Sequence, residues 1–278
     1  MLGTKTPVAL AGALLIAALG AASQLGAAPP ASAPGAVIAV GGGGTPDVVP
    51  THALELARAR TSKPIDVVVI PHASRREDRG VASAEMWREA GADRVTILPD
   101  ERDGAVRALQ GAEVVWMGGG SQTRLLAHLR EQGLVDAVRA AHQRGAVVGG
   151  TSAGAAVLGS VTIAGSPDPA PYVQGSMERE PGLGLVPDAI VDQHFAERQR
   201  EGRLLTALLE GGAARGFGVS EGTGAVFSKN GFEVIGRSTV LVVDASEVER
   251  EKAEDGALMM GAGLRVDLVR TGAAWVAR

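Results

Sequence analysis

The stretch AVVGGTSAGAAVL, residues 146–158, decides the fold. Its first part, Ala146–Gly150, is nearly continuously apolar, which is typical of a strand covered on both faces in a parallel sheet. A GxSxG pattern centred on Ser152 follows, and the run Ala155–Leu158 after it predicts a helix. A strand, a serine between glycines and a helix, in this order, predict a nucleophile elbow that exposes the serine hydroxyl at the sheet edge. The alternative is a glycine- and serine-rich turn that only caps the helix.

Four more apolar runs precede this stretch and predict neighbouring strands: Ala36–Val40, Ile65–Ile70, Arg94–Leu98 and Glu113–Met117. The longer segments between the strands predict helices: Asp47–Ala59, Val81–Ala90, Ala105–Gln110, Gln122–Glu131 and Leu134–Gln143. Strand, crossover and strand repeated four times is the pattern of a doubly wound α/β sheet. An aromatic content of 3% agrees with a core of Val, Leu, Ile and Ala.

The later part of the chain has shorter β-like runs: Gly216–Ser220, Ala225–Ser228, Phe232–Ile235, Thr239–Val243 and a last run at Arg265–Val269. Lys229-Asn230-Gly231 is a hairpin-turn sequence between two of them. We therefore expect the sheet to end in antiparallel strands. No internal repeat or long linker interrupts the chain after Ala36, so residues 35–278 are predicted to form a single domain.

The first 34 residues are predicted to lie outside this domain. Lys5 precedes an apolar or small-residue segment, Thr6–Ala22, and Ala27–Pro34 is small and Pro-rich. This order is typical of a secretory signal peptide followed by a spacer, with a cleavage site between Ala22 and Ala33. A membrane anchor is the alternative, but Pro7–Ala22 is short for a span of about 20 residues. The expected location is secreted or periplasmic, without a stable membrane anchor.

Composition excludes several function classes. The 278 residues contain 27 basic and 31 acidic side chains, which give a net charge of −4. This balance lacks the excess of positive charge that is typical of nucleic-acid-binding proteins. There is no cysteine, so a disulfide framework, a thiolate metal site and a cysteine nucleophile are all excluded. Covalent chemistry in this chain must therefore use oxygen or nitrogen.

A serine nucleophile needs a base, and His194 is the best placed of five histidines. It follows the apolar run Ala189–Val191, so it is expected on the same rim as Ser152. Three others lie in predicted helices and are expected to pack or be solvated, and one follows the second strand, where it could border the cleft: His52, His128, His142 and His72. Glu221 and Asp192 both remain candidates for the acid that orients the base, because each lies at the carboxyl end of a strand.

Two further features are not assigned a catalytic role. Gly41–Gly44 follows the first strand, but Pro46 occupies the third glycine position of GxGxxG, so the run is interpreted as a tight turn. Arg198, Arg200 and Arg203 open the predicted helix Ala196–Leu209, where cations oppose the helix dipole. Carboxylate ligands or buried acidic partners are expected to compensate for these charges.

Four segments together resemble cyanophycinase and its relatives in the S51 serine peptidase family: GGGSQTRL (118–125), GTSAGAAVL (150–158), GLGL (182–185) and DQHFAERQREGRL (192–204). The resemblance implies an α/β/α sandwich like that of class I glutamine amidotransferases, with a mostly parallel central sheet. It implies Ser152 as nucleophile, His194 as base and Glu221 as third triad member. It also implies substrate-pocket roles for six residues: Gln122, Asp192, Gln193, Arg198, Arg200 and Arg203.

The resulting hypothesis is an exported serine exopeptidase that releases β-Asp-Arg dipeptides from cyanophycin, a polyaspartate with arginine on each β-carboxyl. Backbone N–H groups near Gly119 and Ala153 would hold the oxyanion, and neither metal nor organic cofactor is required. Three departures from the family pattern, at Ser121, at Gly41–Thr45 and at His72, leave the exact substrate open.

Three alternatives remain: an aspartyl dipeptidase acting on other acidic peptides, a non-catalytic amidotransferase-like binding protein, and an esterase. The α/β-hydrolase esterases place the histidine last in the chain, whereas the order here is Ser, His, Glu. The expected partner is a peptide or a cyanophycin-like polymer. The oligomeric state cannot be read from the residues, so a homodimer stays open.

Overall fold

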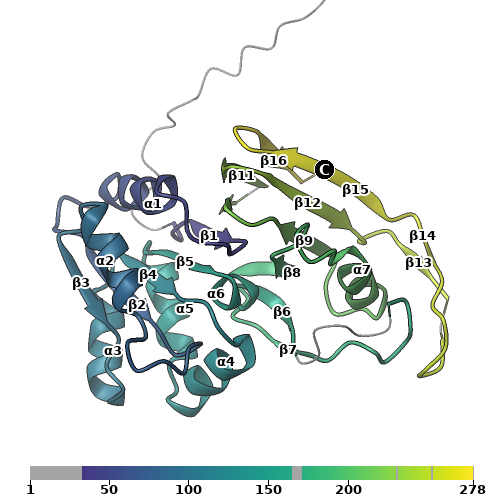
Figure 1. Cartoon of the computed structure of the whole chain (residues 1–278), viewed down its shortest axis with the longest axis horizontal. Coiled ribbons are helices and arrows are strands. Elements are labelled where there is room, and N and C mark those ends of the chain that lie inside the picture. Colours follow the sequence, from purple (N-terminus) through teal and green to yellow (C-terminus); the bar gives the residue numbers. More distant parts are fainter. Residues whose placement is uncertain (1–32, 165–170, 230, 252, 278) are drawn as a thin grey trace, which may run out of the picture.

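The computed structural model describes residues 33–164, 171–229, 231–251 and 253–277, which form two large sheets and a short two-stranded one, with helices around them (Figure 1). The predicted signal peptide, with all but the last residues of its spacer, falls in residues 1–32 and lies outside the described residues. Among the described helices, none is long and apolar enough to cross a membrane.

The first sheet has eight strands in the order β16-β11-β10-β1-β5-β4-β2-β3. Its parallel part contains the five predicted apolar runs, β1 (Val37–Val40), β2 (Asp66–Ile70), β3 (Arg94–Ile97), β4 (Val114–Met117) and β5 (Val147–Thr151). Three antiparallel strands complete it: β10 (Thr223–Ser228), β11 (Gly231–Gly236) and β16 (Ala274–Val276).

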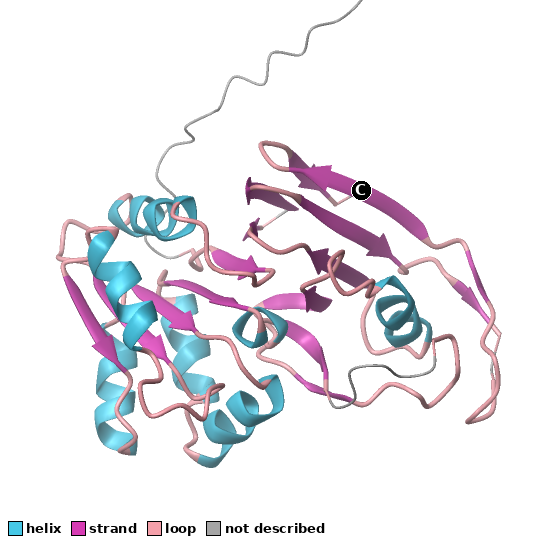
Figure 2. Cartoon of the chain, in the orientation of Figure 1, coloured by secondary structure: helices cyan, strands magenta, loops and turns pink. Residues whose placement is uncertain are grey.

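Helices cover both faces of the parallel strands, as Figure 2 shows. Side chains alternate along a strand, so Ile38 and Val40 pack with α1 (Val48–Arg58) and α2 (Val81–Glu89). The opposite face packs against the remaining helices of this region: α3 (Arg102–Gly111), α4 (Gln122–Glu131), α5 (Val135–Gln143) and α6 (Ala153–Ala156). The predicted α/β/α arrangement with a mostly parallel central sheet is therefore confirmed.

A second sheet differs from the sequence-based expectation of one continuous sheet. It has the order β15-β12-β9-β8-β6-β7 and includes two strands that were not predicted, β6 (Gly159–Ile163) and β7 (Arg179–Pro181). Its other members are β8 (Val186–Gln193), β9 (Arg215–Val219), β12 (Thr239–Asp244) and β15 (Arg265–Arg270). A short pair, β13 (Glu249–Arg250) and β14 (Gly261–Ala262), stands apart from both sheets.

The two sheets share one apolar core. Val191 and Phe217 of the second sheet belong to the same buried cluster as Val148 of the first sheet. The other face of the second sheet packs against α7 (Glu201–Leu209) through Leu204 and Leu208. The turn between β9 and β10 carries the chain from the second sheet back to the first. This return brings loops of both sheets to one edge.

Candidate active site

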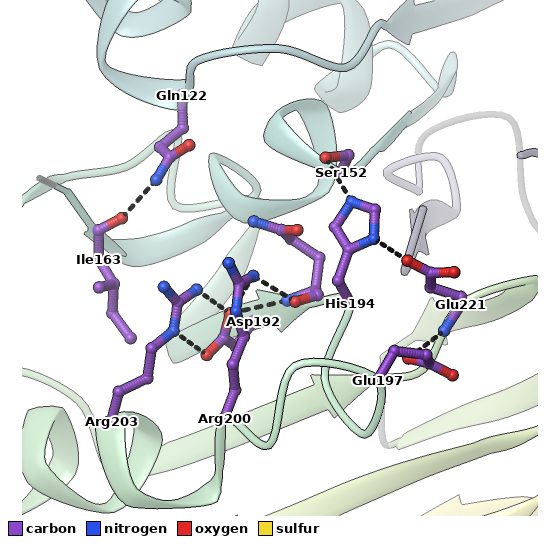
Figure 3. Close-up of polar contacts among 10 residues, drawn as sticks. Gln122, Ser152, Ile163, Asp192, His194, Glu197, Arg200, Arg203 and Glu221 are labelled. Atoms are coloured by element: carbon purple, nitrogen blue, oxygen red, sulfur yellow. Dashed lines mark hydrogen bonds and ion pairs between the residues drawn. The ribbon is translucent and has the colours of Figure 1, made fainter. Parts of the chain in front are cut away.

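Three loops bring Ser152, His194 and Glu221 together (Figure 3). Ser152 directly follows β5, His194 directly follows β8, and Glu221 lies between β9 and β10. The Oγ of Ser152 is 2.9 Å from Nε2 of His194, and Nδ1 of the same ring is hydrogen-bonded to Oε1 of Glu221. The three side chains therefore form a continuous hydroxyl–imidazole–carboxylate chain.

The turn at Ser152 has the geometry of the predicted elbow. Ser152 has φ +54° and ψ −112°, a backbone conformation that residues other than glycine rarely adopt. The glycines of the pattern are needed for space. A Cβ on Gly150 would lie within 3.0 Å of Gly154, and a Cβ on Gly154 would lie within 3.0 Å of Met117. The GxSxG spacing thus allows strand, serine and helix to pack closely enough to aim the hydroxyl at His194.

The partners of His194 define its tautomer. An ionised carboxylate only accepts hydrogen bonds, so Nδ1 carries the ring proton and donates a hydrogen bond to Glu221. Nε2 is then left with a lone pair that faces the hydroxyl of Ser152. The His194 side chain is 11% exposed and that of Glu221 is 34% exposed, so the carboxylate stays in reach of water while the ring is nearly enclosed.

Asp192, the other candidate acid, does not contact His194 but binds two arginines. Nε of Arg203 donates to Oδ2 at 2.7 Å, Nη2 of Arg203 donates to Oδ1, and Nη1 of Arg200 lies 3.5 Å from Oδ1. Strand alternation predicts that Asp192 and His194 share a face. His194 instead lies beyond the end of β8 with φ +48°, and this turn separates the two side chains.

Asp192 therefore supplies the negative charge that offsets these two positive charges near the N-terminus of the helix. Arg200 occupies the N-cap position of α7 and donates from its side chain to the carbonyl of Gln193, and Arg203 lies in the first turn of the helix. Both are almost fully buried, whereas Arg198 is exposed. We call Asp192, Arg200 and Arg203 the ion cluster. Figure 3 shows this cluster to one side of His194, and Asp192 binds two nitrogens of the Arg203 guanidinium.

Two glutamines predicted for the substrate pocket differ in their contacts. Gln122 begins α4 and donates from Nε2 to the carbonyl of Ile163 at 3.0 Å. Gln193 is 4% exposed, and in the described part of the chain its Oε1 has no hydrogen-bond partner. A buried amide oxygen without a donor is costly, so Gln193 is suited to receive a hydrogen bond from a bound molecule.

The two backbone segments predicted to hold an oxyanion flank Ser152. Ala153 is the first residue of α6, and a Cβ on Gly119 would lie 3.4 Å from Cβ of Ser152. A pocket of about 220 Å³ opens beside Gly119 and is lined in part by Ser74 and Arg76 from the loop after β2. Gly119 therefore borders this pocket on one side and Ser152 on the other.

The other four histidines have different partners. His72 is bonded to Asp100 and stacks on His128 with ring centroids 3.6 Å apart, and burial lowers the pKa of both rings. His52 is 2.9 Å from Glu233, whose hydrogen bond raises the pKa of the ring. His142 bonds to the carbonyl of Gly35 at 2.9 Å, and burial lowers its pKa. The structure brings His194, and none of these four, to Ser152.

Sequence reasoning missed two neighbours of the three side chains. The carboxylate of Glu197 accepts a hydrogen bond at 3.0 Å from the backbone N–H of Glu221. The glycine run after β1, interpreted as a simple turn, packs against both His194 and Glu221. Its position at the carboxyl end of a central strand was the available signal. Among the described residues, no group of three or more His, Cys, Asp or Glu is placed to hold a metal ion.

The sequence model described as Peptidase family S51 matches residues 37–235. This chain belongs to peptidase family S51. It is 37% identical over 200 residues to the cyanophycinase of Trichormus variabilis, an alignment that covers 69% of this chain and 67% of the relative. The cyanophycinase of Thermosynechococcus vestitus is 36% identical over 226 residues, covering 77% and 69% of the two chains.

The fold agrees with this membership. The crystal structure of a peptidase from an acI-B1 Actinobacterium superposes with a TM-score of 0.68 at 19% identity, covering 89% of this chain and 98% of that one. The prediction of an S51 serine-type peptidase with a class I glutamine amidotransferase-like fold is confirmed.

Proposed function

We propose that this S51 peptidase is an exported exopeptidase of cyanophycinase type, and that Ser152, His194 and Glu221 perform its chemistry. The observation that carries the proposal is the hydrogen-bonded chain from the Oγ of Ser152 through both ring nitrogens of His194 to Glu221. The assigned tautomer places a basic nitrogen against the serine hydroxyl, which is the arrangement that nucleophilic catalysis by serine needs.

The reaction follows from these positions. Oγ of Ser152 attacks the carbonyl carbon while Nε2 of His194 takes its proton, and Glu221 stabilises the imidazolium through Nδ1. The N–H groups of Gly119 and Ala153 donate to the oxygen that becomes negative. His194 then returns the proton to the leaving amine, and a water molecule, activated by the same nitrogen, releases the acyl group from Ser152.

The surroundings support an acidic, arginine-bearing substrate. The unpartnered Oε1 of Gln193 can accept from a guanidinium, and the exposed Arg198 can donate to a carboxylate. Because Arg200 and Arg203 bind the carboxylate of Asp192, their role is to support the site, and of the three arginines predicted for the substrate pocket Arg198 is the exposed one. The two relatives described above are named cyanophycinases, which favours cyanophycin as the polymer that is cleaved.

Incubation with purified polymer tests this proposal. The chain without residues 1–34 should release soluble β-Asp-Arg from cyanophycin and should leave ordinary proteins intact, and Ser152→Ala should release nothing. Hydrolysis of α-linked Asp-X dipeptides without release from the polymer would move the assignment to an aspartyl dipeptidase. A wild-type chain that neither hydrolyses these substrates nor reacts with a fluorophosphonate would be a binding protein.

Export rests on the sequence of residues 1–34 and has its own test. Fused to a reporter, this segment should direct it out of the cytoplasm and be cleaved, because a charged start, an apolar run and small residues follow one another. Lys5→Glu should slow the transfer. An uncleaved reporter that stays in the cytoplasm would remove export from the proposal without affecting the peptidase chemistry.

A further inference from the structure

The segment after β1 touches all three loops that carry the proposed catalytic residues. Three successive carbonyls accept backbone hydrogen bonds: Val40 from the N–H of Ser152 at 3.0 Å, Gly41 from that of His194 at 2.6 Å, and Gly42 from that of Gly222 at 2.9 Å. Gly222 directly follows Glu221. We call residues 40–43 the strap, since one short segment holds the loops after β5, after β8 and between β9 and β10.

The strap also packs directly against two of the side chains. A Cβ on Gly42 would lie within 3.0 Å of Cε1, Nε2 and Nδ1 of His194, and a Cβ on Gly43 would lie within 3.0 Å of Oε2 of Glu221. Real Cβ atoms essentially never approach so closely. Both glycines have positive φ, +95° and +65°, so the backbone itself turns toward the imidazole and the carboxylate.

This contact matters because the proposed nucleophile and base belong to different sheets. Ser152 follows a strand of the first sheet and His194 follows a strand of the second. The strap extends from β1 in the first sheet and binds both loops, so it fixes their separation. An error of about 1 Å in such a separation lowers the rate about 10²-fold, because proton transfer requires hydrogen-bond contact.

We propose that Gly42 and Gly43 are positioning residues, which hold the ring of His194 and the carboxylate of Glu221 in line with Ser152. The inference rests on the proposed function, because it assumes that these three side chains perform the reaction. It assigns a role to a glycine run that the sequence alone explains as a turn.

Gly44 provides a matched control. It has φ +92°, so alanine there meets the same kind of backbone strain as alanine at Gly42, but a Cβ on Gly44 has nothing within 4 Å. The difference between Gly42→Ala and Gly44→Ala therefore isolates the contact with His194 from the loss of glycine flexibility.

The experiment measures fluorophosphonate labelling of Ser152, kcat and KM on the hydrolysed substrate, and thermal unfolding, for the wild type and for Gly42→Ala, Gly43→Ala and Gly44→Ala. Gly42→Ala should lower labelling and kcat about 10²-fold with KM changed less than about twofold. Gly44→Ala should keep the wild-type rates. The unfolding temperatures of these two variants should be lowered together.

Gly43→Ala covers the case in which Gly42→Ala does not fold. Its Cβ meets the carboxylate of Glu221, which is partly exposed and can move aside. We expect a labelling rate about 10-fold below that of Gly44→Ala. Labelling of folded Gly42→Ala or Gly43→Ala at the rate of Gly44→Ala would overturn the positioning role. Failure of the wild type to be labelled at all would instead overturn the proposed function.

Discussion

Two carboxylates lie close to the same histidine, and the structure gives them different partners. Glu221 is one-third exposed and bonds to the imidazole of His194, whereas Asp192 is 1% exposed and binds the guanidinium groups of Arg203 and Arg200. An imidazole gains and loses a proton near neutral pH, but a guanidinium stays charged. The partner therefore decides what a carboxylate can do.

The different partners of the two carboxylates lead us to expect that some substitutions lower the reaction rate and that others lower the stability of the fold. Substitutions in the hydroxyl–imidazole–carboxylate chain should alter the reaction while the fold stays intact. The side chain of Glu221 is partly exposed, and alanine at position 152 can adopt the same backbone conformation as the serine. Changing the ion cluster should alter the fold, because a buried charge that loses its partner is uncompensated. Four substitutions, from the largest expected effect to the smallest, can break or sharpen this division.

Ser152→Ala should have the largest effect, a loss of about 10⁶-fold in kcat, or about 8 kcal/mol of transition-state stabilisation. Alanine fits the elbow but has no hydroxyl to attack a carbonyl. His194→Ala should fall about as far, and the double variant no further, because nucleophile and base act as a unit. Turnover and thermal unfolding check this. A variant that retains more than a few per cent of the wild-type rate would contradict the role of Ser152.

Glu221→Gln should lower kcat about 10⁴-fold, or about 5.5 kcal/mol. The amide NH₂ can donate to Nδ1 of His194, which would place the ring proton on Nε2, against Ser152. Stability should change little, since the side chain is partly exposed. The prediction is checked by measuring kcat and, on the same variant, the free energy of unfolding in urea. If Asp192→Asn lowered kcat more than Glu221→Gln does, Asp192 would replace Glu221 as the orienting acid.

Asp192→Ala should cost about 3–5 kcal/mol of unfolding free energy, because it leaves Arg203 and Arg200 buried without their carboxylate. The measurement is urea unfolding at neutral pH. Any activity loss at low temperature, where the variant stays folded, should be much smaller than that of Glu221→Gln. A stable variant with no activity would show that the division between the two carboxylates is wrong.

Arg203→Lys should cost about 2 kcal/mol, because an ammonium cannot reproduce the two forked bonds to Asp192. Arg94→Lys is the matched control: Arg94 makes the same forked contact with Asp66, at 2.6 Å for both bonds, but on the surface. Its unfolding free energy should match that of the wild type within error, since water screens the pair. Equal losses in the two variants would show that burial is not what distinguishes the ion cluster.

The elements that sequence patterns predicted well are those with a strong local signal. The five parallel strands come from short runs rich in apolar residues, of which only the edge strand β3 has exposed residues, and the structure places each within one or two residues of its predicted bounds. The elbow at Ser152 was also predictable, because its glycines are needed wherever a strand, a serine and a helix pack this closely.

What was missed depends on pairing between distant segments. The strands β9 and β10 are separated by a short turn but join different sheets, and no local pattern encodes which partner each strand finds. Likewise, alternation could not decide between Glu221 and Asp192, because it assumed that β8 continues through His194. The left-handed turn at His194, and the arginines that engage Asp192, come from tertiary packing.

The return of the chain between the sheets has a consequence for the order of folding. The strand β10 pairs with β1 although more than half of the chain lies between them. Such distant pairings form late, because the entropy of closing a long loop is lost before the new contacts can offset it. Ser152 therefore meets His194 only when the two sheets have docked. A chain that is still being synthesised carries Ser152 without His194 beside it, and the proposed reaction becomes possible only at the last stage of folding.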